Sequence, residues 1–242
     1  MKGAATDNLM LRMKAGAAAG LIIILIISAH LARQAIPLSG NVLAPQAPKV
    51  AIDAGHGGYD GGAQWGDVIE KDINLAITMQ LREILLATGY RVALTRYGDY
   101  SLVEQEQVSN PKKREDMVRR LAVIEEFQPD AILVIHCNAF RSTIWSGAQT
   151  FYQEEYDRGK LLAQDIQRYL CEFTDTNRKA SSLDMFLLRE GSVVGSLVEA
   201  GFLSNPGERE LLQHTGYQRI LATAIWLGLD RYLRDSSLEN SQ

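Results

Sequence analysis

The sequence predicts an α/β protein: a single open, mostly parallel sheet with helices on both faces, preceded by an N-terminal transmembrane helix. Beyond residue 48, short apolar runs alternate with segments of helical period, as expected for strands and helices that alternate along a chain. The central run, residues 131–135, is apolar without interruption, which is typical of a strand buried on both faces. The transmembrane helix is predicted from residues 15–32, which carry no formal charge.

The apolar segment 15–32 is just long enough to cross the hydrocarbon core of a membrane as a helix. Three basic residues precede it, and only Arg33 follows closely. Basic flanks stay on the cytoplasmic side, so we expect residues 1–14 to be a cytoplasmic segment and the chain after Arg33 to be exported. A cleaved signal peptide is the alternative, although Ile27-Ser28-Ala29 is a mediocre cleavage site. Residues 15–32 are therefore expected to be a membrane anchor or signal segment.

The remaining chain divides into a linker, a folded domain and a tail. Residues 33–48 contain three prolines and little periodicity, which predicts a semi-rigid linker. The folded domain is expected over residues 49–234, followed by a flexible tail over residues 235–242. A total of 242 residues fits this division into one folded domain and its attachments.

The pattern of the folded domain predicts each element in order. Apolar runs predict strands at residues 50–52, 92–94, 131–135, 147–152, 186–188 and 196–198. Helical spacing predicts helices at residues 71–88, 111–127, 157–173 and 217–234. Gly89 ends the first helix, and Asn110-Pro111 provides an N-cap and a first-turn proline for the second.

Charge and cysteine content exclude two classes of protein. The net charge is −4, of which residues 1–39 contribute +3, so the rest of the chain carries −7. An acidic domain lacks the basic footprint that sequence-independent nucleic-acid binding needs. The two cysteines, Cys137 and Cys171, cannot form a disulfide framework. We expect both to be free thiols, with Cys137 acting as a small buried apolar residue.

Polar side chains stand at the ends of three predicted strands. Asp53 and His56 follow the first strand, His136 follows the most apolar one, and Glu199 follows the last. Because ligands of open α/β sheets bind at the carboxyl ends of strands, these residues suggest one convergent site. A solvated loop histidine at 56 and a hydrogen-bonded core histidine at 136 remain the alternatives. His214 is expected to lie in an exposed turn.

Two histidines and one carboxylate form a known catalytic zinc set, with water in the fourth position. Glu70 is the favoured carboxylate, because it stands at the start of a helix, which is a rigid mounting point. Glu199 is expected to act as general base or as a further ligand, and a surface glutamate is the alternative. Asn138 is predicted either to donate a hydrogen bond to substrate or to be structural. The carboxylates near His56 that remain open as ligands are Asp60, Asp67, Glu70 and Asp72.

Four motifs resemble those of zinc-dependent N-acetylmuramoyl-L-alanine amidases: DAGHGGYDGGA at 53–63, IEKDINL at 69–75, IHCNA at 135–139 and LVEAGFLSNPGE at 197–208. The resemblance covers residues 49–233. Three shorter segments, IPLSG at 36–40, WSGAQTFY at 145–152 and NRKA at 177–180, are similar to the germination-specific cortex amidases of spore-forming bacteria. Ala54, Val134 and Cys137 depart from the usual family residues, and none of these departures removes a candidate ligand.

The resemblance implies that His56, Glu70 and His136 bind one Zn²⁺ per chain and that Glu199 is the catalytic carboxylate. The implied reaction hydrolyses the amide between N-acetylmuramic acid and L-alanine in peptidoglycan. In the cortex subgroup this step prepares muramic-δ-lactam formation by a separate enzyme, and part of the subgroup has a lipoprotein activator. The alternatives are another zinc peptidase that acts on wall stem peptides, and an inactive wall-binding protein.

Overall fold

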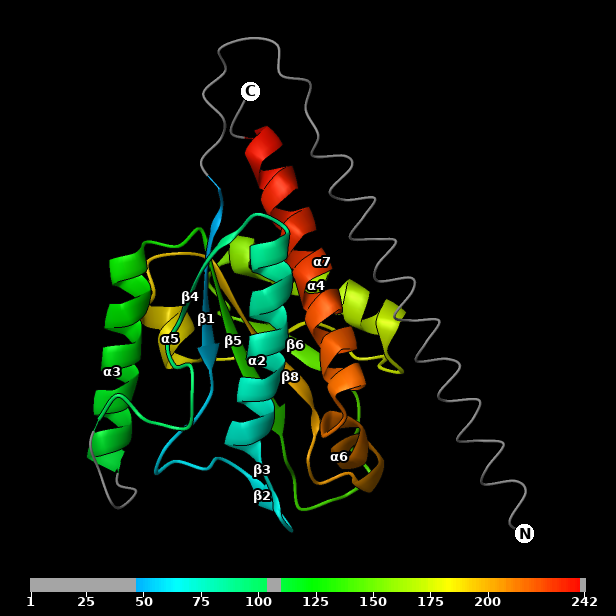
Figure 1. Ribbon diagram of the computed structural model, residues 1–242. Helices are drawn as coiled ribbons and strands as arrows, with labels where there is room; N and C mark the ends of the chain where they lie inside the picture. The colour runs from blue at the N-terminus through cyan, green and yellow to red at the C-terminus, as the bar shows by residue number, and fades with distance from the viewer. Residues whose placement is uncertain (1–46, 104–109, 240–242) are drawn as a thin grey trace. The chain divides into compact units, whose positions relative to one another are not determined.

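A computed structural model describes residues 47–103 and 110–239 (Figure 1). The predicted anchor or signal segment 15–32, the cytoplasmic segment before it and nearly all of the linker 33–48 lie outside the described residues. Within the described ranges, no helix combines the length and apolar character needed to cross a membrane. The membrane prediction therefore remains untested by the structure.

The central sheet has six strands in the order β4-β1-β5-β8-β6-β7. β4, β1, β5 and β8 run parallel to one another, whereas β6 pairs antiparallel with β8 and parallel with β7. A separate hairpin of β2 and β3 lies in the segment between β1 and α2. The strand bounds are β1 Lys49–Ala54, β2 Gln64–Trp65, β3 Val68–Ile69, β4 Arg91–Leu94, β5 Ala131–Asn138, β6 Gln149–Tyr152, β7 Ser181–Ser182 and β8 Gly195–Phe202.

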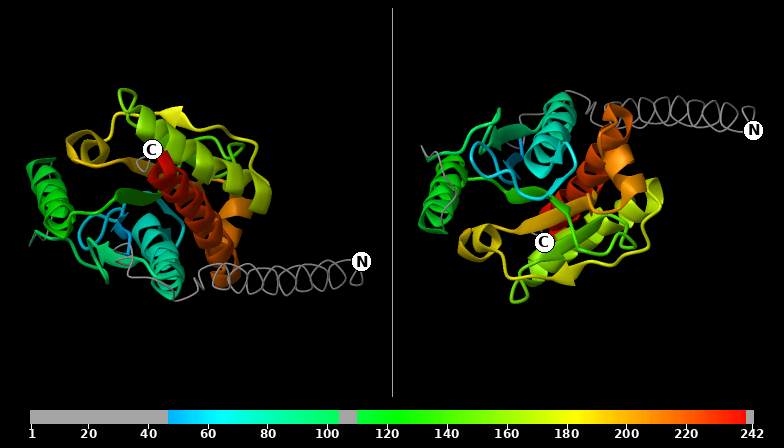
Figure 2. Two further views of the ribbon diagram at one scale, coloured as in Figure 1. Left: turned by 90° about the horizontal axis from the view of Figure 1, so that it is seen from above. Right: turned by 90° about the horizontal axis from the view of Figure 1, so that it is seen from below.

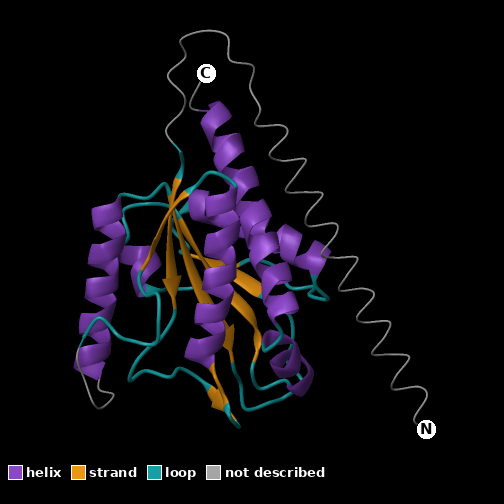
Figure 3. Cartoon of the chain, viewed as in Figure 1, coloured by secondary structure: helices purple, strands orange, loops and turns teal. Residues whose placement is uncertain are grey.

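Helices cover both faces of this sheet, which confirms the predicted α/β class with a mostly parallel sheet. α2, α4 and α7 pack together against one face, and α3 and α5 contact the other (Figures 2 and 3). α6 lies between β8 and α7. The helix bounds are α2 Glu70–Ala87, α3 Asn110–Phe127, α4 Asp157–Phe173, α5 Phe186–Glu190, α6 Pro206–Leu212 and α7 Thr215–Glu239.

The central strands and the helices beside them form the core. All five residues of the apolar run 131–135 are fully buried, as expected for a strand covered on both faces. Ile77 and Leu81 of α2 and Trp226 of α7 are also fully buried. This rigid centre fixes the positions of the strand ends, where the candidate site lies.

Two of the predicted elements differ in the structure. Residues 186–188 form the short helix α5, not a strand: the amides of Leu188 and Arg189 donate to the Met185 carbonyl. A short apolar run fits a buried helical turn as well as a strand, so periodicity could not separate the two. α7 continues to Glu239, where a flexible tail was expected after residue 234. The Arg231–Asp235 ion pair at 3.8 Å spans the predicted end of that helix.

Candidate metal centre

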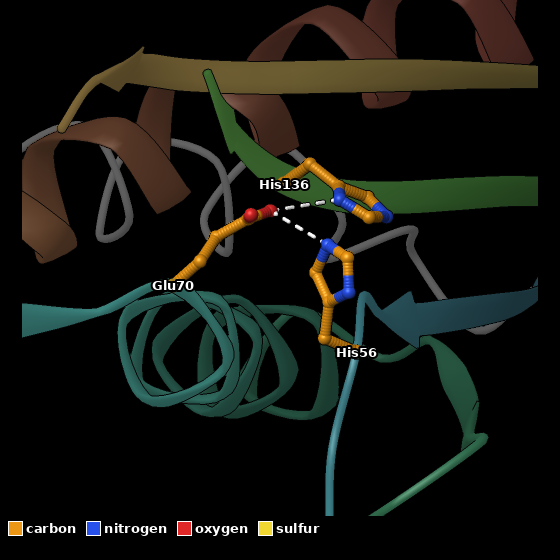
Figure 4. Close-up of side chains that lie close together, drawn as sticks. All are labelled: His56, Glu70 and His136. Atoms are coloured by element: carbon orange, nitrogen blue, oxygen red, sulfur yellow. Dashed lines mark hydrogen bonds and ion pairs between the residues drawn. The ribbon is translucent and has the colours of Figure 1, made fainter. Parts of the chain in front are cut away.

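Three side chains from distant parts of the chain converge at the carboxyl ends of the central strands (Figure 4). His56 comes from the loop after β1, Glu70 is the first residue of α2, and His136 lies near the end of β5. Glu70 Oε1 lies 3.1 Å from His56 Nε2 and 2.9 Å from His136 Nδ1. One ligand atom from each residue falls within 4.8 Å of the other two. The structure thus brings the predicted set together.

Glycines leave the room that these side chains occupy. A Cβ on Gly62 would lie 2.5 Å from Glu70 Oε2 and 2.6 Å from His56 Cδ2, and the backbone φ of Gly62 is +70°. A Cβ on Gly55 would lie 2.2 Å from the His136 ring. His56 itself has a φ of 62°, a conformation that few residues other than glycine adopt. The absence of a side chain at Gly55 and at Gly62 is therefore a steric requirement of this cluster.

Hydrogen bonds from outside the cluster hold two of the ligand side chains, His56 and Glu70, in place. Asp60 Oδ2 lies 3.0 Å from His56 Nδ1, so that Nε2 faces Glu70. Asn74, one turn along α2, donates from Nδ2 to Glu70 Oε1 at 3.1 Å, and the amides of Ala63 and Cys137 donate to the same carboxylate. Such outer contacts fix the orientation of metal ligands in proteins.

Two buried arginines hold the backbone that carries His56. Arg120 donates to the carbonyls of Ala54 at 2.9 Å and His56 at 2.6 Å. Arg96 donates to the carbonyls of Ala54 and Gly55 at 2.8 and 3.0 Å. Arg96 also donates to the Lys71 carbonyl at 2.7 Å, so it joins the His56 loop to the start of α2. The sequence prediction missed both arginines.

Electrostatics favour an anionic Glu70 and a proton on His56 in the metal-free protein. Burial alone would raise the pKa of Glu70, but hydrogen bonds with His136 and His56 hold it well below its usual range. Burial alone would lower the pKa of His56, whereas its contacts with Asp60 and Glu70 raise it to about 9. A metal ion at this cluster would therefore displace a proton from His56.

Glu199 lies beside this cluster but outside it. In the parallel pairing of β5 and β8, Glu199 is the register partner of His136. Its Oε2 is buried and has no hydrogen-bond partner among the described residues. Burial raises the pKa of Glu199 to about 7. A carboxylate with this pKa beside a water-accessible site is suited to take up and release protons near neutral pH.

The donor set fits a zinc ion. Ligand atoms around a tetrahedral zinc lie about 3.3 Å apart, given bonds of about 2.0–2.1 Å. The distances of 2.9 and 3.1 Å between Glu70 Oε1 and the two histidine nitrogens are close to this value. The His56 and His136 side chains keep 20% and 18% of their surface exposed, which leaves one side of the cluster open. Three donors with an open side are typical of a catalytic zinc site.

The other candidates have different positions. Asp53 is buried and pairs with Arg120 at 2.8 Å and with Thr95 at 2.6 Å, and it is not a member of the histidine–glutamate cluster. Asp67 and Asp72 are exposed, and so is His214, as predicted. The Asn138 carbonyl accepts from the Leu203 amide, and its side chain is half-buried.

The cysteines are as predicted. Cys137 and Cys171 are both free thiols, and Cys137 is buried.

The fold and the cluster together define a class: an α/β protein whose parallel strands present a candidate metal centre and a second glutamate at one edge of the sheet. The family model Amidase_3, described as N-acetylmuramoyl-L-alanine amidase, matches residues 50–231. The chain therefore belongs to the N-acetylmuramoyl-L-alanine amidase family, and it is an enzyme of that kind.

Individual relatives agree with this assignment. The chain is 36% identical over 203 residues to the germination-specific N-acetylmuramoyl-L-alanine amidase of Bacillus subtilis, and the match covers 83% of each protein. The CwlD amidase of Clostridioides difficile, solved in complex with the GerS lipoprotein, matches with a TM-score of 0.75 at 38% identity, over 77% of this chain and 98% of that chain. An N-acetylmuramoyl-L-alanine amidase from Clostridium difficile 630 matches with a TM-score of 0.69 at 28% identity, over 78% and 98%.

Proposed function

We propose that this amidase hydrolyses the bond between N-acetylmuramic acid and L-alanine in peptidoglycan with one Zn²⁺ held by His56, Glu70 and His136. The observation that carries the proposal is the convergence of these three side chains beside the half-buried Glu199. The family match supports the amide as the bond that is cleaved.

The residues of the chain divide the chemistry between them. A bound zinc ion would supply a Lewis acid that polarises a carbonyl and acidifies water. Glu199 takes a proton from the attacking water and delivers it to the leaving amine of L-alanine. Its pKa of about 7 in the metal-free protein suits both steps. Asp60 and Asn74 keep His56 and Glu70 oriented, and Asn138 donates a hydrogen bond to substrate.

The proposed setting is maturation of the spore cortex. Removing the peptide leaves the muramic acid carboxyl free for muramic-δ-lactam formation by a separate enzyme, a step needed for germination. Support comes from the similarity to the germination-specific amidase of Bacillus subtilis. A lipoprotein activator is proposed as a partner, because the similar CwlD amidase was solved in complex with the GerS lipoprotein.

The catalytic domain, residues 49–234, is proposed to work outside the cytoplasmic membrane, with residues 15–32 as the anchor. The apolar run and its basic N-terminal flank support this topology. Cell fractionation tests it: full-length protein should remain with membranes, whereas a fragment that starts at residue 40 should be soluble. A mature protein that begins at His30 would show cleavage and overturn the anchor.

The function is tested by substituting His136. His136→Ala removes one of the three proposed ligands, so both zinc retention and muropeptide turnover should be lost. Zinc is measured by mass spectrometry of the purified protein, and turnover by the release of stem peptides. His214→Ala, at an exposed histidine far along the chain, is the matched control. If the His136→Ala protein kept one zinc per chain and normal turnover, His136 would be a core residue and not a metal ligand.

A further inference from the structure

Three large apolar side chains are exposed on the loop that follows the His136 strand. The β5–β6 loop, residues 139–148, carries Phe140, Ile144 and Trp145, which keep 53%, 77% and 48% of their surface exposed. Ile144 is the most exposed large apolar residue in the described part of the chain. Apolar groups gathered on one exposed segment are a mark of a binding surface.

This loop is held in a fixed shape although its side chains face solvent. Arg178 Nε donates to the Ser146 carbonyl at 2.7 Å, and the Gly147 amide donates to Glu208 Oε1 at 2.7 Å. Asn205 Nδ2 donates to the Thr143 carbonyl at 3.1 Å. A loop fixed at several points presents its apolar side chains at little further loss of conformational entropy, which favours binding.

The same contacts connect the loop to the active-site strands. Glu208 Oε2 accepts from the Phe202 amide at 2.8 Å, three residues after Glu199 on β8. The Phe140 and Phe202 rings lie 5.8 Å apart. The loop starts from the end of β5 that carries His136, and Figure 1 shows it at the carboxyl ends of the central strands, near α6.

We propose that Ile144 and Trp145 form a subsite for a sugar ring of the glycan strand, next to the scissile amide. This inference rests on the proposed function, which places a muramic acid ring on the acyl side of that amide. A pyranose ring presents a face of C–H groups that packs on aromatic and aliphatic side chains, and the Trp ring offers the largest such face.

At Trp145 the surface fits the sugar better than it fits the stem peptide. Stem peptides of peptidoglycan carry carboxylates, which call for cationic partners. Arg178, the cation beside Trp145, already donates to Ser146 and Gln149 and lies over the Trp145 ring at 5.9 Å from its centroid. The guanidinium lies over one face of the indole, and Trp145 still keeps 48% of its surface exposed. That exposed surface suits an uncharged ligand.

The test compares full-length wild type, Trp145→Ala, Trp145→Phe and Leu161→Ala. Leu161 is a matched control, because it is 54% exposed on α4. KM and kcat are measured on a disaccharide–tetrapeptide. Inhibition constants are measured for the two separate products, the disaccharide and the free tetrapeptide. Zinc content and thermal unfolding confirm that each variant is intact.

Trp145→Ala should raise KM and the inhibition constant of the disaccharide about threefold to tenfold, the size of one aromatic contact. Its kcat and its inhibition constant for the tetrapeptide should stay within twofold of wild type. Trp145→Phe should recover most of the loss, and Leu161→Ala should match wild type.

Three results would overturn the sugar subsite. The first is an unchanged inhibition constant for the disaccharide in Trp145→Ala. The second is no inhibition of wild type by the disaccharide. The third is a higher inhibition constant for the tetrapeptide, and not for the disaccharide, in Trp145→Ala. Each leaves the proposed function intact as long as wild type contains zinc and cleaves the amide. A wild type without amide cleavage would mean that the proposed function itself has failed.

Discussion

Gly62→Ala tests whether the glycine loop positions the metal ligands. The added Cβ would lie 2.5 Å from Glu70 Oε2 and 2.6 Å from His56 Cδ2. Carbon and oxygen atoms in contact stay about 3.2 Å or more apart, so the ligands must move by about 0.5 Å or more, which is the positional tolerance of a preorganised site. We expect the dissociation constant for zinc to rise at least about tenfold, or about 1.4 kcal/mol.

Gly66→Ala separates this contact from backbone strain. Gly66 has nearly the same conformation, with a φ of +63° against +70° for Gly62, but a Cβ there would meet nothing within 4 Å. In both variants an alanine must therefore adopt a left-handed backbone conformation, which lowers the free energy of unfolding by about 1–2 kcal/mol. Only Gly62→Ala should lose zinc affinity.

Competition with a chromophoric chelator measures zinc affinity, and thermal unfolding of the metal-free proteins measures strain. Wild-type affinity in Gly62→Ala would refute the steric argument. An equal loss of affinity in Gly66→Ala would assign the effect to strain and not to contact with the ligands.

Two further predictions concern protons and the buried arginine. Because zinc needs a neutral His56, and the pKa of His56 is raised to about 9 in the metal-free protein, zinc binding at pH 7.5 should release about one proton from this residue. Apparent zinc affinity should rise about tenfold per pH unit up to pH 9 and level off above it. Calorimetry in buffers of different ionisation enthalpy measures the proton release. If no proton is released, the contacts of His56 with Asp60 and Glu70 are contradicted. Arg120→Met should lower the free energy of unfolding by about 3–5 kcal/mol, because it leaves the Asp53 carboxylate buried without its cation. The control is Arg119→Met, which removes a surface ion pair and should leave the free energy of unfolding in urea close to that of wild type. Equal losses in the two variants would contradict the role of burial.

Much of the sheet could be predicted because burial imposes a simple pattern. The uninterrupted apolar run 131–135 marks a strand covered on both faces, and the structure places β5 there. The spacing of Ile73, Ile77 and Leu81 marks the buried face of α2. The pattern failed at residues 186–188, where two consecutive buried leucines fit either a strand or a turn of helix.

The candidate site could be predicted in part. His136 and Glu199 stand out because a polar group after a buried strand needs a partner. Glu70 could not be separated from nearby carboxylates by spacing alone, and the family resemblance selected it. Arg96 and Arg120 were missed because their partners lie about forty and sixty-five residues away, and no local pattern reports such contacts. Asn74 had a local signal, since it lies one turn after Glu70 on the same face of α2.

The proposed mechanism gives the two glutamates different roles: Glu70 binds the metal, and Glu199 acts as the general base. Glutamine has nearly the shape of glutamate but takes up no proton at neutral pH. Glu199→Gln should therefore keep zinc near the wild-type level and lose about 10²–10⁴-fold in turnover, the range of general-base assistance. Glu70→Gln should lose zinc affinity, because a neutral amide replaces an anionic ligand that contacts both histidines.

The most direct measurement is mass spectrometry of muropeptides digested by wild type, Glu199→Gln and Glu70→Gln, beside the zinc content of each protein. Wild type should release intact stem peptides that begin with L-alanine, and release should require zinc. Glu199→Gln should contain zinc and release almost none. Cleavage within the stem peptide, a zinc-free Glu199→Gln beside a zinc-loaded Glu70→Gln, or full activity of Glu199→Gln would each contradict the account.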